Sequence, residues 1–225
     1  MNINFIDLIF FPVLSLLILI CILGYGIFFN KYTYINEDKI GLKNLIFIQG
    51  LIFIGLVFIF INFFYPISDT LSIITILIGT LLYVINFLKI KRKKPELNFL
   101  FFVLIFSFIY CFYAGISDDF NYHYETIKNF KNQNLYEILH HRTISYNSHW
   151  LFLTSIFSLS YLNSTLFILT ALFFTISIYD FLKLSLVITK NKNYYLSILS
   201  FFILIFFLGV LNNYKDLGTD IPGVI

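Results

Sequence analysis

Residues 45–65, LIFIQGLIFIGLVFIFINFFY, decide the fold class because no charged side chain interrupts them. A helix needs about 20 apolar residues to cross the roughly 30 Å hydrocarbon core of a bilayer. Strands of a membrane barrel alternate polar and apolar residues over about ten positions, whereas this stretch is apolar at odd and even positions alike. The stretch therefore predicts a transmembrane helix, which satisfies its own backbone hydrogen bonds.

Similar apolar blocks recur along the chain and predict about six transmembrane helices, at residues 5–29, 45–65, 71–88, 97–115, 160–182 and 194–211. The composition agrees, because 59% of the residues are hydrophobic and only 12% are charged. A soluble domain of this size could not bury that much apolar surface. We expect an all-α, polytopic helical membrane protein that forms a single transmembrane domain.

The basic residues predict the orientation of these spans. Most of the 15 Lys and Arg lie in the loops after the first, third and fifth blocks, most densely in KIKRKK at 89–94. Loops rich in Lys and Arg stay in the cytoplasm. We therefore expect the N-terminus and the loops 66–70, 116–149 and 212–220 on the outer face of a bacterial inner membrane. The apolar ending IPGVI at 221–225 resembles the start of another span, so we expect an N-terminal part of a longer protein, truncated at residue 225.

The external loop 116–149 gathers the side chains best suited to chemistry. It holds all four histidines of the chain and is much longer than the other external loops. Long loops on a rigid scaffold commonly carry function. Apolar residues in it recur at roughly helical spacing: Phe120, Tyr124, Ile127, Phe130 and Ile138. This pattern predicts an amphipathic helix that lies in the membrane interface.

Asp118 and Asp119 precede this helix and have two interpretations of equal weight. Aspartates in the first turn of a helix interact favourably with the helix dipole. Alternatively, two adjacent carboxylates can divide labour, one as general base and the other orienting a partner or holding a divalent cation. His123 follows Asp119 by four residues and shares its helix face. Metal dependence stays open, although the histidine spacings fit no standard zinc pattern.

His140, His141 and Arg142 form a second polar cluster in the loop. Arg makes charge-assisted hydrogen bonds to phosphate oxygens, and histidines can add further bonds. The alternative interpretation is an ordinary solvated loop. Asn147 and His149, at the entry to the next block, complete the candidate substrate-binding residues together with His123.

Residues 118–150 resemble the GT-C superfamily of polytopic membrane glycosyltransferases. The resemblance rests on Asp-Asp at 118–119, Tyr-His-Tyr at 122–124, His-His-Arg at 140–142 and Asn-Ser-His-Trp at 147–150. Two departures accompany it: relatives are longer, and many place the acidic loop after the first span, whereas here it follows the fourth block.

The resemblance implies an enzyme that moves a hexosyl or pentosyl unit from a polyprenyl-phosphate carrier to a cell-envelope acceptor on the outer face. It implies that Asp119, with Asp118 beside it, deprotonates or aligns the acceptor hydroxyl. It further implies that Arg142, with His140 or His141, faces the carrier phosphate. The expected partners are membrane lipid, the lipid-linked sugar donor and a glycan, lipid or protein acceptor. Nucleic acid is not expected.

Two other interpretations remain open: a transporter or flippase subunit for a lipid-linked glycan, and a membrane scaffold without chemistry. Ion-coupled transporters keep a charged or strongly polar group at mid-depth in the membrane. Here Asn62 and Asn86 are the deepest strongly polar residues of the blocks, and each suits a hydrogen bond between helices. The uncharged blocks disfavour ion coupling but do not exclude a scaffold.

Overall fold

The computed structural model describes residues 5–33, 43–89, 94–113, 120–138 and 149–190, together with residues 194, 195, 198, 199, 201, 202 and 205. The described part is helical and contains no strand beyond one isolated bridge between Leu159 and Leu162. The all-α class predicted from the apolar blocks is therefore confirmed for the described part.

Long helices dominate the described chain. They are α1 (Phe5–Thr33), α3 (Lys43–Phe64), α4 (Asp69–Lys89), α5 (Lys94–Tyr113) and α9 (Ile168–Lys190). Shorter elements lie between α5 and α9: α6 (Phe120–Asn132), α7 (Leu135–Ile138), α8 (His149–Phe157) and the 3-10 helix η2 (Asn163–Phe167).

Four of the described helices are long and apolar enough to cross a membrane, which makes the chain an integral membrane protein. The candidate spans are Ile9–Tyr32, Asn44–Phe64, Asp69–Lys89 and Thr165–Leu186. The block predicted at 97–115 forms α5, whose described apolar stretch Glu96–Tyr110 is shorter. The block at 194–211 lies mostly outside the described residues, so the sixth span stays a prediction.

The span predicted at 160–182 begins later than expected, because the residues before it form a turn. The Thr165 hydroxyl accepts a hydrogen bond from Leu159 N at 2.8 Å and donates one to Leu162 O at 2.6 Å. Hydroxyl side chains compete in this way with regular helical hydrogen bonds. The chain therefore passes through η2 before α9 starts at Ile168.

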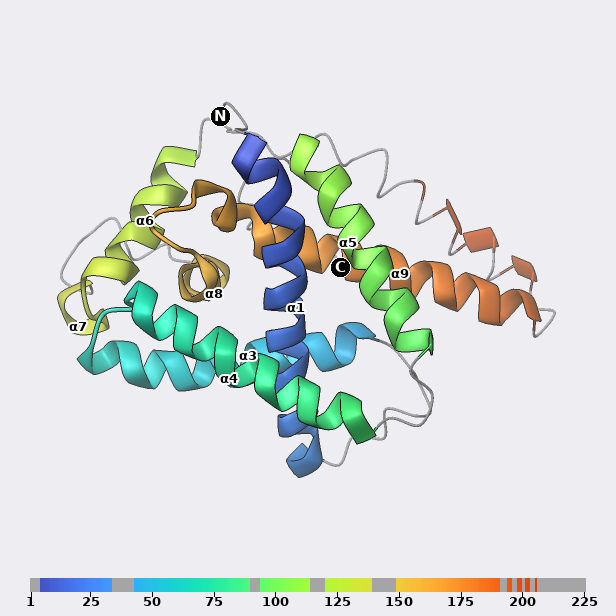
Figure 1. Cartoon of the computed structure of the whole chain (residues 1–225), viewed down its shortest axis with the longest axis horizontal. Helices are drawn as coiled ribbons and strands as arrows, with labels where there is room; N and C mark the ends of the chain where they lie inside the picture. Colours follow the sequence, from blue (N-terminus) through green and yellow to red (C-terminus); the bar gives the residue numbers. More distant parts are fainter. Residues whose placement is uncertain are drawn as a thin grey trace.

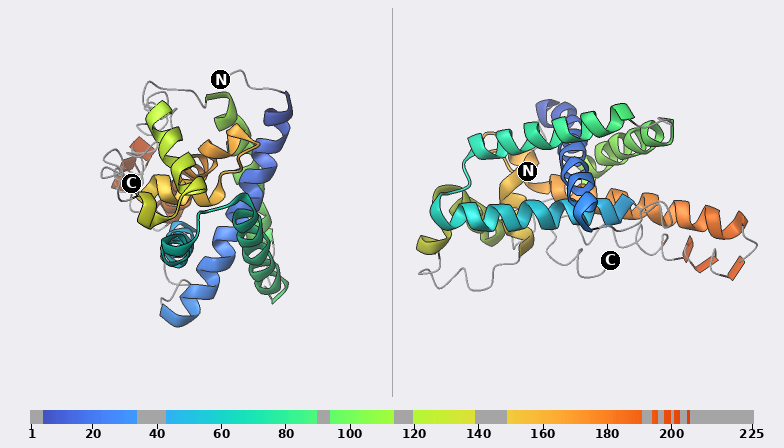
Figure 2. Two further views of the ribbon diagram at one scale, coloured as in Figure 1. Left: turned by 90° about the vertical axis from the view of Figure 1, so that its left-hand side faces the viewer. Right: turned by 90° about the horizontal axis from the view of Figure 1, so that it is seen from below.

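The helices do not form a simple parallel bundle. α3, α4 and α9 run roughly along the long axis of the molecule, whereas α1 passes between α3 and α4 and crosses them (Figures 1 and 2). Glycines make this crossing possible. A Cβ atom added at Gly24 of α1 would collide with the carbonyl oxygen of Gly79 in α4, and one at Gly26 would collide with that of Ile46 in α3. Small residues let membrane helices approach this closely.

α9 forms the centre of the packing. Of its span, 83% is buried inside the protein, compared with 28% of the span formed by α4, so α4 faces outward. Phe173 of α9 contacts Phe47 of α3 and Trp150 of α8, with ring centroids 6.2 and 5.6 Å apart. Where α3 begins, the Asp180 carboxylate accepts a hydrogen bond from Asn44 N at 2.7 Å. This bond satisfies one of the backbone donors that a helix start leaves open.

Candidate functional site

Lys131 of α6 fastens the segment between α5 and α8 to the rest of the protein. Its amine lies 2.8 Å from Asp69 Oδ1 and 2.9 Å from Ser72 Oγ, both in the first turns of α4. The side chain of Lys131 is only 7% exposed, and that of Asp69 is 28% exposed. A buried charge needs such a partner, because its removal from water is otherwise costly.

Asp69 joins three segments that are distant in the sequence. Besides Lys131, it accepts hydrogen bonds from Ser160 N at 3.1 Å and from the Ser160 hydroxyl at 3.2 Å. Ser160 lies in the turn between α8 and η2. The start of α4, the last turn of α6 and the turn after α8 therefore meet at one carboxylate.

Backbone contacts reinforce the docking of α6. Ile67 N donates to Phe130 O at 3.0 Å, and the Asn62 amide donates to Gln133 O at 3.4 Å. The Phe130 ring also meets Phe152 of α8, with centroids 5.1 Å apart and planes at 81°. α6 is thus held by the end of α3, the α3–α4 connection and α8.

Burial lowers the pKa of the Lys131 amine below its usual value of 10.5, and the neighbouring Asp69 carboxylate opposes this shift. Desolvation disfavours the charged form of an amine, whereas a nearby negative charge favours it. The direction of the shift shows that the cost of burial exceeds the attraction of Asp69.

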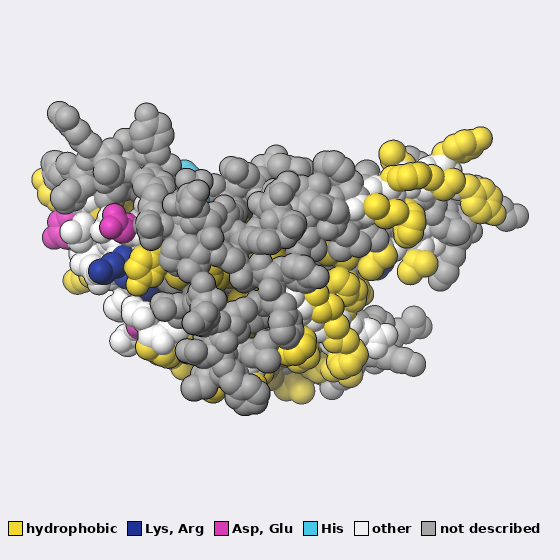
Figure 3. Space-filling view, turned by 90° about the horizontal axis from the view of Figure 1, so that it is seen from above, with side chains coloured by type: hydrophobic (Ala, Val, Ile, Leu, Met, Phe, Trp, Pro, Cys, Tyr) yellow, Lys and Arg dark blue, Asp and Glu magenta, His cyan; other side chains and the backbone are white. Residues whose placement is uncertain are grey.

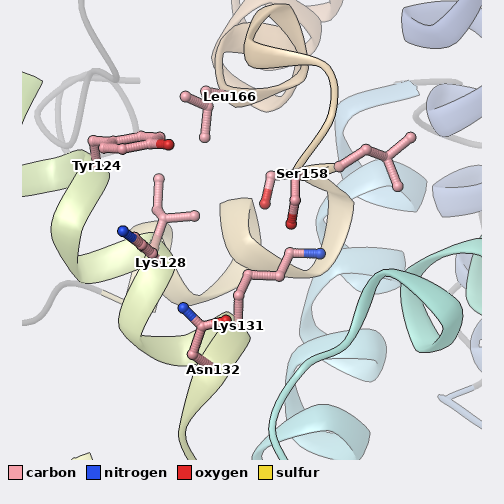
Figure 4. Close-up of a pocket in the computed structure, with 9 residues that line it drawn as sticks. Tyr124, Lys128, Lys131, Asn132, Ser158 and Leu166 are labelled. Carbon is pink, nitrogen blue, oxygen red and sulfur yellow. The ribbon is translucent and has the colours of Figure 1, made fainter.

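A polar pocket of about 290 Å³ lies beside this ion pair (Figure 4). One wall is a face of α6, formed by Tyr124, Ile127, Lys128, Lys131 and Asn132. The facing wall comes from the α8–η2 turn and η2, with Ser158, Leu159, Ser160 and Leu166. In Figure 4 the Lys131 side chain extends away from Lys128 and towards the α3–α4 connection.

An apolar groove of about 420 Å³ lies between α3 and α8. Its α3 side consists of Ile48, Leu51, Ile52, Gly55, Leu56 and Ile59. Its other side consists of His149, Trp150, Phe152 and Leu153 of α8, with Phe173 of α9. Ile52 and Leu56 are at least half exposed, so the groove is open on the outward surface of a membrane-spanning helix.

The short helix α8 borders both cavities. Its first residues line the apolar groove, and the turn that follows Phe157 lines the polar pocket. Seen from above, the described charged side chains gather at the end of the molecule that holds α6 and α7, whereas hydrophobic side chains cover the opposite end (Figure 3). The polar pocket lies at the end of the molecule that holds α6.

Comparison with known proteins adds a family but no activity. Residues 8–225 match the model of a family described as a domain of unknown function (DUF8201). The chain belongs to the DUF8201 family. No curated protein and no solved structure matches the chain.

Of the site residues predicted from the sequence, the structure describes His123 and His149. His123 lies half-buried on α6, and His149 is exposed at the start of α8, where it lines the apolar groove. The remaining predicted residues, Asp118, Asp119, His140, His141, Arg142 and Asn147, lie outside the described residues. Within the described part, no group of three or more His, Cys, Asp and Glu residues could hold a metal ion.

The helix predicted in the external loop forms as α6, and Ile127 and Phe130 are buried as its pattern indicates. These residues pack against protein, and the position of α6 relative to a membrane interface stays a prediction. Lys131 was not among the site residues predicted from the sequence. A signal was available, since Lys131 follows Ile127 by four residues and so shares its apolar face.

Proposed function

We propose that the chain is the membrane-embedded part of a glycosyltransferase that moves a sugar from a polyprenyl-phosphate carrier to a cell-envelope acceptor. One observation carries the proposal: the short helix α8 borders an apolar groove at its start and leads into a polar pocket at its end. A polyprenyl-phosphate sugar joins a long apolar chain to a polar head, so it needs two such surfaces close together. The resemblance of residues 118–150 to the GT-C superfamily supplies the reaction class.

In the proposed reaction, Asp119 takes the proton of the acceptor hydroxyl. The oxygen of that hydroxyl attacks the anomeric carbon of the sugar. The bond between that carbon and the carrier phosphate breaks, and the phosphate leaves with the electron pair. Arg142, with His140 or His141, would stabilise the negative charge of the leaving phosphate. In the sequence, Asp119 directly precedes α6, and the last turn of α6 is docked through Lys131.

The proposal includes a bacterial inner membrane, six spans, and an N-terminus and loop 116–149 on the outer face. Figure 1 supports this orientation, because the start of α3 and the ends of α4 and α9 point towards one end of the long axis. α6, α7 and the α3–α4 connection lie at the other end. The first group of helix ends adjoins the basic loops, which the positive-inside rule assigns to the cytoplasm.

The proposal is tested by Asp119→Asn in the protein in native membranes supplied with a radiolabelled polyprenyl-phosphate sugar. We expect transfer to fall by roughly 10²–10⁴-fold, the usual contribution of general acid–base catalysis. Glu125→Gln, an exposed carboxyl on α6, is the matched control and should leave transfer unchanged. Full activity of Asp119→Asn would remove Asp119 from the mechanism. Movement of the labelled lipid across vesicles without sugar transfer would instead indicate a flippase.

A further inference from the structure

Among the described residues that line the polar pocket, one positive charge has no partner of opposite charge. The amine of Lys131 is paired with Asp69, so these two charges cancel. Lys128, one turn earlier on α6, lies exposed at the pocket and makes no ion pair within the described part of the chain. Within the described part of the chain, Lys128 is therefore the cationic contact that this pocket offers a ligand.

The two serine hydroxyl groups of the pocket offer acceptors rather than donors. The Ser158 hydroxyl donates to Ser155 O at 3.1 Å, and the Ser160 hydroxyl donates to Asp69 Oδ1 at 3.2 Å. Each hydroxyl has one proton but two lone pairs, so both still accept hydrogen bonds from a ligand. The exposed Asn132 amide adds a donor and an acceptor. The ligand that satisfies this set carries several hydroxyl groups of its own.

Between these polar groups the lining is aliphatic. Ile127, Leu159 and Leu166 present C–H surface to the cavity, and the tyrosine Tyr124 stands at its edge (Figure 4). Small-molecule pockets typically combine such apolar walls with a few placed polar groups and measure roughly 300–1,000 Å³. At about 290 Å³, this pocket suits a ligand of the size of one sugar ring.

We propose that this pocket binds an anionic sugar unit, with its carboxylate or phosphate facing Lys128 and its hydroxyls facing Ser158, Ser160 and Asn132. A bare phosphate fits less well, because it has no sugar ring to cover the aliphatic walls formed by Ile127, Leu159 and Leu166. The inference rests on the proposed function and narrows it: the acceptor or the transferred unit is a uronic acid or a phosphorylated sugar.

The test is ligand-observed saturation-transfer NMR on the full chain in detergent, with methyl glucuronide and glucose 6-phosphate as the two anionic probes. We expect saturation transfer to at least one of them, and which one binds distinguishes a carboxylate from a phosphate. Lys128→Gln should raise the dissociation constant about tenfold or more, because hydrogen bonds to charged groups are the stronger ones. Lys128→Arg should preserve binding. Lys89→Gln, an exposed lysine at the far end of α4, is the matched control and should behave as the wild type.

Three results would overturn the inference: equal saturation transfer to the neutral methyl glucoside, displacement of the anionic probe by inorganic phosphate at an equal concentration, or no saturation transfer to either anionic probe. Unchanged binding in Lys128→Gln would equally remove Lys128 from the site. Because the experiment measures binding without transfer, its failure is distinct from a failure of the transferase proposal. If the anionic probe binds but Asp119→Asn retains full transferase activity, the sugar site is supported and the proposed role of Asp119 is wrong.

Discussion

At the scale of single residues, Lys131 is the side chain on which the docking of α6 depends. Lys131→Met keeps the aliphatic stem but removes the charge opposite Asp69. Breaking a fully buried ion pair from one side costs roughly 3–5 kcal/mol. Asp69 is partly exposed and keeps the Ser160 hydrogen bonds, so we expect a loss of about 2–3 kcal/mol in the free energy of unfolding. Thermal or denaturant unfolding of the detergent-solubilised protein measures this loss.

Lys128→Met is the matched control for this substitution, because Lys128 lies exposed on the same helix. Substitutions of exposed residues usually change stability by no more than about 0.5 kcal/mol. The double variant Asp69→Asn with Lys131→Met should lose less than the sum of the two single variants, since the pair acts as a unit. Equal stability of the Lys131 and Lys128 variants would show that the ion pair does not hold α6.

The lowered pKa of Lys131 predicts how this contribution changes with pH. At pH values just below 10.5, the ordinary pKa of a lysine amine, Lys131 stays protonated in the unfolded chain. In the folded chain its amine has already begun to lose the proton in that range. Stability rises with pH wherever the unfolded state binds more protons. The stability of the wild type relative to Lys131→Met should therefore increase as pH is raised from neutral towards 10.5. A decrease over that range would mean that the attraction of Asp69 outweighs the cost of burial.

The sequence predicted single residues less well than it predicted helices. The histidines drew attention because all four lie in one loop, yet His149 lines an apolar groove. Asp69 was not singled out, because its partners Lys131 and Ser160 are 62 and 91 positions away in the sequence. Contacts of that separation depend on how the helices pack, which hydrophobic periodicity does not encode.

At the scale of elements, the crossing of α1 over α4 depends on Gly79. A Cβ atom added there would lie 2.7 Å from Cys21 O and 2.5 Å from Cys21 Sγ. The carbonyl oxygen belongs to a rigid helix and cannot move alone, so Gly79→Ala must separate the two helices. Overpacking of this kind costs about 1–3 kcal/mol, and sometimes more. We expect a loss of that size in the free energy of unfolding, measured in detergent.

Gly55→Ala provides the control for the crossing. The nearest atom to a Cβ at Gly55 is Leu153 Cδ2 at 3.2 Å, the end of a flexible side chain that can shift by a few tenths of an ångström. We expect this variant to stay close to the wild type in stability. Comparable losses in Gly55→Ala and Gly79→Ala would contradict the view that backbone contact limits the approach of α1 and α4.

The sequence predicted the long helices because a long unbroken apolar block in a membrane satisfies its backbone hydrogen bonds only as a helix. α1, α3 and α4 coincide closely with the blocks 5–29, 45–65 and 71–88. The segment from α8 to η2 was not anticipated, because its apolar residues continue into the next block without a charge. Only the hydrogen bonds of Thr165 reveal that the chain turns there before α9 begins.

At the scale of the whole molecule, the long axis separates two unlike ends. α6 docks on the α3–α4 connection and the start of α4 at one end, and this contact requires the segment that holds α6 and the α3–α4 connection to lie on the same side of a membrane. The distribution of Lys and Arg in the sequence predicted that both segments lie on the same side. No pattern in the sequence predicted that α1 crosses between α3 and α4. Hydropathy predicts which segments span a membrane, whereas the angle of each span is set by side-chain packing.

Cysteine labelling in intact cells tests the orientation directly. Tyr136→Cys places a thiol on α7, where the native side chain is 61% exposed, and Lys89→Cys places one at the exposed end of α4. Both are introduced into a chain whose native Cys21 and Cys111 are replaced by alanine. We expect a membrane-impermeant maleimide to label the α7 thiol in intact cells and the α4 thiol only after the membrane is opened. Labelling in the reverse order would put the polar pocket on the cytoplasmic side and exclude transfer to an acceptor on the outer face.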